Sequence, residues 1–97
     1  MVVHIVMFKF KEENKSVNIT KVKAELEALK DKIDVLKTME VGVNFIDSER
    51  SMDLSLYSVF ENEEDLKAYA IDEEHLKVLS LIKAVIIESK VVDYILK

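Results

Sequence analysis

The sequence predicts a single small α+β domain whose strands and helical regions follow one another in β-α-β-β-α-β order. Short runs rich in Val, Ile and Phe alternate with longer segments whose apolar residues recur every three or four positions. Ninety-seven residues fit one domain, and a hydrophobic content of 49% excludes a disordered chain. We therefore expect residues 1–97 to form one compact unit.

The first two elements are a strand and an amphipathic helix. Residues 2–10 read VVHIVMFKF, a short run of strand-forming residues, and we expect a strand there. Residues 16–37 carry apolar side chains at three- and four-residue steps, which predicts a helix with one buried face. Ser16 or Asn18 is the expected N-cap of this helix.

The second half of the chain repeats this alternation of strands and helices. Residues 39–46 alternate in polarity and predict a strand, and residues 53–60 predict another strand after a polar turn. Residues 61–70 predict a short helix with an acidic start, and residues 72–85 predict another helix after a break. The stretch 86–96 predicts the last strand. The order is that of the ferredoxin-like split βαβ fold.

The expected sheet is apolar on both of its faces. Side chains of a strand alternate between the two faces, and both sets are apolar in the first, third and last strands. The first strand places His4, Val6, Phe8 and Phe10 on one face, and Val3, Ile5 and Met7 on the other. Two helices cover only one face. We therefore expect a second copy to cover the other face and close a barrel across a homodimer; the alternative is a monomer with an apolar sheet surface.

Composition excludes several classes of function. The chain has no Cys, which excludes disulfides and thiolate metal sites. A net charge of −5 and a single Arg, Arg50, argue against nucleic-acid binding. We expect no membrane association, because no apolar run approaches the roughly 20 residues of a membrane helix. The first residues lack the features of a signal peptide, and we expect a cytoplasmic protein.

Several segments, in order, resemble the stress-responsive dimeric α/β-barrel (Dabb) family. They are HIVMFKFK from residue 4, VGVNF from residue 41, SERSMDLSL from residue 48, FENEEDLKAY from residue 60 and VVDY from residue 91. The resemblance covers nearly the whole chain. It implies a dimeric α+β barrel with a pocket between sheet and helices, in a family whose members mostly lack a known activity and are called stress-responsive.

The resemblance extends more weakly to the olivetolic acid cyclase type branch, which closes a linear polyketide by an aldol reaction without metal or cofactor. It implies that Tyr69 and His75 correspond to the Tyr and His that act together in that branch, and that His4 corresponds to the His of the family's first strand. The family often has His-Pro-x-His where this chain has Asp72-Glu73-Glu74-His75. Asp72 is a good N-cap in its own right, so we expect the helix to begin here all the same.

The candidate site residues also have ordinary structural interpretations. His75 in the first turn of a helix suits a neutral base, or a hydrogen-bonded helix-start residue. Tyr69 suits a donor to a developing enolate, or an amphipathic core residue. His4 suits either a contact to a polar substrate group or a satisfied core histidine. As substrate-binding residues on one sheet face we predict His4, Val6, Phe8 and Leu56.

Neither a metal nor a cofactor is expected. His4, His75 and Asp72 would make a two-His, one-carboxylate set, but no local motif supports it. Three hypotheses remain: a protein that binds a small, mostly apolar molecule; a cofactor-free cyclase or lyase that moves protons with Tyr69 and His75; or a structural stress protein without catalysis. Related haem- or quinone-linked monooxygenases are the least favoured comparison, because no haem ligand set is evident.

Overall fold

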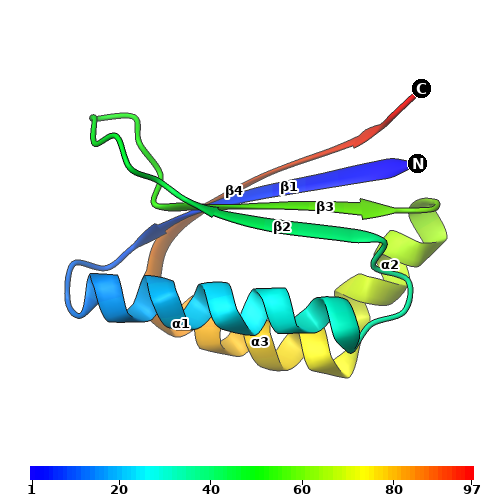
Figure 1. Ribbon diagram of the computed structural model, residues 1–97, viewed down its shortest axis with the longest axis horizontal. Helices are drawn as coiled ribbons and strands as arrows, with labels where there is room; N and C mark the ends of the chain where they lie inside the picture. The colour runs from blue at the N-terminus through cyan, green and yellow to red at the C-terminus, as the bar shows by residue number, and fades with distance from the viewer.

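A computed structural model describes all 97 residues and has the predicted β-α-β-β-α-β order. Its elements are β1 (Val2–Phe10), α1 (Lys15–Ala28), a 3-10 helix η1 (Leu29–Asp31), β2 (Thr38–Val43), β3 (Leu54–Phe60), α2 (Glu63–Ile71), α3 (Glu73–Val85) and β4 (Ile86–Ile95). The strands form one antiparallel sheet in the order β2-β3-β1-β4. Helices α1 and α3 run side by side along one face of the sheet, and α2 lies at one end (Figure 1). The ferredoxin-like prediction is confirmed.

The hydrophobic core lies between this helical layer and the sheet. Sixteen buried residues form one apolar cluster, with the inward residues of β1 and β3 at its centre. Antiparallel pairing sets Val6 opposite Leu56 and Phe8 opposite Leu54, so these four side chains share the helix-covered face. Helix α1 contributes Val22 and Leu26 to the cluster, among others. This packing holds β1, which carries His4, against the helices.

The first helix is shorter than predicted. It ends at Ala28 and is followed by η1, whereas the sequence predicted a helix to residue 37. Ile33 and Leu36 are buried all the same, in a turn where the Leu36 N–H donates to the Ile33 carbonyl at 3.2 Å. A three-residue spacing places two side chains on the same side in a turn as well as in a helix. The predicted caps, Ser16 and Asn18, were also wrong, because both lie inside α1.

The remaining boundaries follow local hydrogen bonds. Strand β2 ends at Val43 rather than at residue 46, and residues 44–53 form a loop. Asn62 caps α2 by accepting from the Asp65 N–H at 2.9 Å. Asp72 caps α3 by accepting from the Glu74 N–H at 2.8 Å, as predicted. The cap at Asp72 interrupts the helical path between α2 and α3 and changes the direction of the chain.

The sheet face turned away from the helices, called the back face below, is apolar as predicted. Strand pairing places Ile5 between Tyr57 and Val92, and Val3 between Val59 and Tyr94. All the helices lie on the opposite side (Figure 1). Met7, Val92 and Tyr94 on this face are exposed, although Val3 is buried. No helix of the chain combines the length and apolar character needed to cross a membrane.

Candidate functional site

Three residues that the sequence singled out meet at one end of the helix-covered sheet face. The ring centroids of Tyr69 and His75 lie 4.3 Å apart, and those of Tyr69 and His4 lie 6.4 Å apart. Tyr69 comes from the end of α2 and His75 from the first turn of α3. The break at Asp72 turns the chain, so two side chains six residues apart face each other. Phe60 on β3 lies beneath, 5.0 Å from the Tyr69 ring.

The Tyr69 hydroxyl is buried and has no hydrogen-bond partner. The residue is 1% exposed, so water does not replace the missing partner at the surface. An unsatisfied buried hydroxyl costs about 1–3 kcal/mol, which makes it an uncommon feature of a native core. Burial raises the pKa of Tyr69 to about 12. The phenol therefore keeps its proton at neutral pH and is available as a hydrogen-bond donor.

The His75 ring is held in one tautomer by the end of α2. Its Nδ1 lies 3.0 Å from the Ala70 carbonyl oxygen. A carbonyl only accepts, so Nδ1 carries the hydrogen in the neutral ring and Nε2 keeps its lone pair. Burial lowers the pKa of His75 and outweighs the opposing effect of the Ala70 hydrogen bond; nearby His4 lowers the pKa further. The ring is therefore neutral at pH 7, as a base requires.

His4 is oriented by a partner that the sequence analysis missed. Its Nδ1 is hydrogen-bonded to the Asp93 carboxylate, and the two residues are opposite each other in the β1–β4 register. A signal was present in the sequence. Asp93 alternates with Val91 and Ile95 on one face of β4, so a carboxylate interrupts a row of apolar residues on this exposed edge strand. The pairing needs β4 beside β1, which the local pattern does not specify.

A hollow of about 210 Å³ lies between α2 and the edge of the sheet, and His4, Tyr69 and His75 do not line it. Its lining is Val2, Glu63, Leu66, Lys67, Asp93, Tyr94 and Ile95. Asp93 links it to the cluster through the hydrogen bond to His4, and Leu66 lies one helical turn before Tyr69. Pockets for drug-sized ligands are roughly 300–1,000 Å³. This hollow therefore fits a smaller molecule, with apolar walls and two charged side chains from α2 at its rim.

Residues 2–96 match the model of the stress responsive A/B barrel domain, Dabb. The chain belongs to this family. The match spans all of the secondary structure and confirms the resemblance drawn from the sequence. No curated protein matches the chain.

Solved structures of the same fold include both uncharacterised proteins and an enzyme. A dimeric ferredoxin-like protein of unknown function from Bacteroides fragilis is 35% identical, with 96% of this chain and 93% of that chain covered and a TM-score of 0.86. A dimeric ferredoxin-like protein from Thermobifida fusca is 20% identical (98% and 90% covered, TM-score 0.88). A hydroxynitrile lyase from Passiflora edulis is 18% identical (99% and 93% covered, TM-score 0.88). The last two similarities show the fold of the Dabb domain alone.

The other predicted substrate-binding residues lie deeper in this Dabb domain. Val6, Phe8 and Leu56 are between 3% and 8% exposed and belong to the apolar core cluster. They line none of the three hollows in the structure. Of the four predicted residues, His4 alone lies within the cluster around Tyr69, and substrate contact by the others stays a prediction. No three His, Asp or Glu side chains are grouped closely enough to hold a metal ion.

Proposed function

We propose that this Dabb protein binds a small, mostly apolar molecule that carries a carbonyl or hydroxyl group. The unpartnered, buried Tyr69 hydroxyl is the observation that supports this proposal most. A neutral phenol donates to a carbonyl, and the free Nε2 of His75 accepts from a hydroxyl, so both groups favour an uncharged polar ligand group. The ligand enters at the hollow beside Asp93, and its apolar part packs on Val2 and Leu66. Because Tyr69 and His75 do not line this hollow, side chains around Tyr69 move aside when the ligand reaches them.

Native mass spectrometry of the freshly purified protein tests this proposal. Mass added to the wild-type protein and lost in Tyr69→Phe and His75→Ala supports a ligand at the cluster. Ser80→Ala is the matched control, because it removes a hydroxyl from an exposed residue of α3 that lines none of the hollows. Saturation-transfer NMR with acetophenone, a small aryl ketone, provides a second readout. An equal signal from the wild-type protein and Tyr69→Phe would exclude the cluster as the binding site.

A second candidate function is cofactor-free proton transfer by a cyclase or lyase. The tautomer of His75 is the observation in its favour, because Nε2 carries the lone pair while the pKa is lowered, so the ring is unprotonated at pH 7. In such a reaction Nε2 removes a proton from carbon next to a carbonyl, and the Tyr69 hydroxyl donates to the enolate oxygen. His4, oriented by Asp93, positions the substrate.

Exchange of the α-protons of acetophenone in D₂O, followed by NMR, separates binding from catalysis. A catalyst accelerates the exchange, and His75→Ala reduces the acceleration by about 10²-fold or more, the usual contribution of a general base. Binding without any accelerated exchange would leave the first proposal standing and remove the second. If neither Tyr69→Phe nor His75→Ala alters binding, exchange or growth under stress, the third hypothesis from the sequence, a structural stress protein without catalysis, is favoured.

We also propose that two copies associate through the back face of the sheet. Apolar residues of β1, β3 and β4 line this face, the helices lie on the other side, and similar solved structures are described as dimeric. Ile5→Asp places a charge in the middle of the face. Analytical ultracentrifugation should then show a dimer for the wild-type chain and a monomer for the variant. A wild-type monomer at micromolar concentration would contradict the proposal. Cytoplasmic location and a role in stress stay predictions.

A further inference from the structure

The loop between β2 and β3, residues 44–53, holds large apolar side chains in water. Phe45 is 91% exposed and the adjacent Ile46 is 64% exposed. Single exposed apolar residues are common on protein surfaces, but a contiguous exposed patch marks a contact site. Val43, at the end of β2, is exposed as well, but its pairing with Leu54 sets it on the helix-covered face. No contact within the chain explains why the loop holds Phe45 and Ile46 exposed to water.

Hydrogen bonds fix the backbone of this loop. The Ile46 carbonyl accepts from Asn44 Nδ2 and from Ser51 Oγ, each at 2.8 Å. The hydroxyls of Ser48 and Ser51 are 2.8 Å apart, and Lys9 Nζ donates to the Ser51 carbonyl at 3.3 Å. A loop ordered before contact loses little conformational entropy on contact. The network thus presents Phe45 and Ile46 in a fixed position, as an interaction surface requires.

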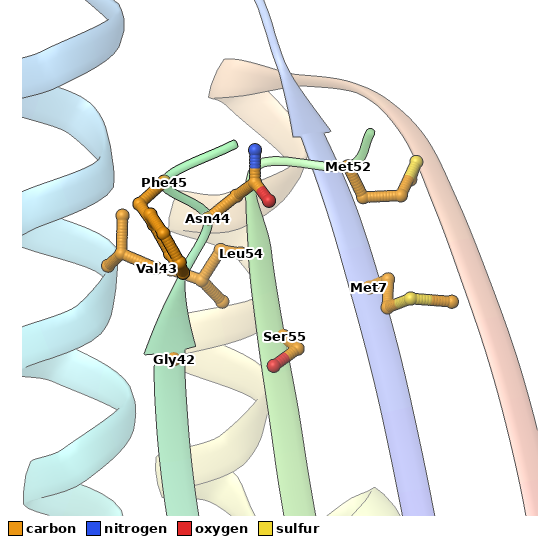
Figure 2. A pocket seen from close by; sticks show the side chains of 8 residues that line it. All are labelled: Met7, Gly42, Val43, Asn44, Phe45, Met52, Leu54 and Ser55. Atoms are coloured by element: carbon orange, nitrogen blue, oxygen red, sulfur yellow. The ribbon is translucent and has the colours of Figure 1, made fainter. Parts of the chain in front are cut away.

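A hollow of about 340 Å³ lies against the loop. Met7 and Met52 lie on one side of it and Phe45 on the other, with Ser55 between them (Figure 2). Gly42 contributes no side chain to this hollow, and a Cβ there would be in ordinary contact with Ser55 Oγ at 3.4 Å. The space is therefore large enough for an aromatic or aliphatic side chain, and its methionines adapt to the shape of that side chain.

The hollow is continuous with the back face of the sheet. Met7 and Gly42 are both paired with Ser55, so these three residues share that face. The loop rises on the same side, away from the helices, while the C-terminal end of β4 rises at the other end of the sheet (Figure 1). A body that covers the back face therefore also meets Phe45 and fills the hollow.

We infer that Phe45 and Ile46 anchor the contact with a second copy of this chain, and that an apolar side chain of the second copy occupies the hollow beside Met7. The inference rests on the proposed dimer and adds the residues that hold it together. A second copy is favoured over another partner because the protein that is 35% identical over nearly the whole chain is described as dimeric. In a dimer with a two-fold axis, the loop of each copy contacts the other copy in the same way, so no binding surface is left over for further copies.

Sedimentation equilibrium of three proteins tests the inference. Phe45→Ser should raise the dimer dissociation constant by about 10- to 100-fold, the usual effect of truncating an interface anchor. Ile71→Ser is the matched control, because Ile71 is 77% exposed at the end of α2, away from the loop, and should leave the constant unchanged. A wild-type monomer overturns both the dimer and the inference. A dimer that Phe45→Ser leaves unchanged overturns the inference alone.

Thiol labelling gives a second readout; because Phe45→Cys also removes the anchor, the dissociation constant of each variant is first measured by sedimentation. The chain has no Cys, so Phe45→Cys and Ile71→Cys each introduce a single thiol. Labelling of Cys at 45 should slow as the protein concentration rises through the dissociation constant, while labelling at 71 should not change. Equal rates at every concentration would overturn the inference. Gly42→Leu, which fills the hollow, should weaken the dimer, whereas Gly42→Ala should leave it within about twofold.

Discussion

Replacing Tyr69 by Phe should make the free protein more stable and less functional. The substitution removes one hydroxyl and keeps the ring contacts with Phe60 and His75. That hydroxyl is buried without a partner, and such a group costs about 1–3 kcal/mol relative to its hydrated state in the unfolded chain. We therefore expect Tyr69→Phe to raise the free energy of unfolding by about 1 kcal/mol or more. For a domain of this size, 1 kcal/mol shifts Tm by about 4–8 °C.

Urea denaturation and calorimetry at pH 7 and fixed protein concentration measure this change. Ser80→Ala is the control, because its residue is exposed on α3, on the side opposite the back face, and a surface substitution is expected to stay within about 0.5 kcal/mol. The reasoning is refuted if Tyr69→Phe lowers the stability by 1 kcal/mol or more, because the hydroxyl would then have a partner in solution. A stabilised variant that no longer binds ligand would show that the hydroxyl is retained for function at a cost in stability.

The alkaline limb of the stability curve reports the same hydroxyl independently. Between the ordinary pKa of 10.0 and the native pKa of about 12, the folded protein holds a proton that the unfolded chain has lost. Stability therefore falls as pH rises through this window, by up to about 2.7 kcal/mol for two pKa units. Tyr69→Phe should lack this part of the slope. Identical slopes for the two proteins would mean that Tyr69 ionises as an exposed tyrosine does.

Three further perturbations test other parts of the structure. Because the pKa of His75 is lowered in the folded protein, the unfolded chain binds more protons below pH 6.5. The free energy of unfolding should therefore fall on acidification below pH 6.5, and it should fall less in His75→Gln. Urea unfolding between pH 5 and 7.5 measures both. Asp93→Ala removes the partner of His4; long-range ¹H–¹⁵N NMR should show a changed tautomer of that ring, with a stability loss under about 1 kcal/mol because the pair is partly exposed. Asp53 accepts from the Phe10 N–H at 2.7 Å and from a lysine ammonium at 3.1 Å, and Asp53→Ala should cost about 2–3 kcal/mol in urea denaturation. A loss under 0.5 kcal/mol would show that water replaces these bonds.

The fold was accessible from the sequence because its periodicities are strong. Apolar residues at both odd and even positions of β1 and β3 predicted two apolar sheet faces, including the back face that the helices leave uncovered. The end of α1 was not accessible, because Ile33 and Leu36 keep a helical spacing in a turn. Spacing alone reports which side a residue faces, and it does not report the hydrogen bonds that define a helix. The polar turn between the two strands was predicted, but residues 44–46 were assigned to the strand for the same reason, since Phe45 and Ile46 continue an apolar pattern after pairing stops.

The candidate site was accessible only in part. Tyr69 and His75 stood out through the resemblance to the olivetolic acid cyclase type branch, and the expected helix break between them allows side chains six positions apart to converge. Asp93 did not stand out, because its partner His4 is 89 residues away and the β1–β4 register decides the pairing. Burial of the Tyr69 hydroxyl also escaped the sequence, since it depends on Phe60 and the surrounding packing. Long-range pairing and packing, rather than residue type, therefore determine the chemistry of this cluster.

The two buried hydroxyls of the helix-covered face distinguish structure from function. Ser58 is fully buried on β3, and its hydroxyl donates to the His4 carbonyl at 3.2 Å, so its burial is compensated within the fold. Tyr69 lies nearby against His4 and Phe60 and is equally buried, yet its hydroxyl has no such partner. A Phe at this position would pack as well without the cost. On the proposed function, a ligand supplies the partner that the fold does not give this hydroxyl.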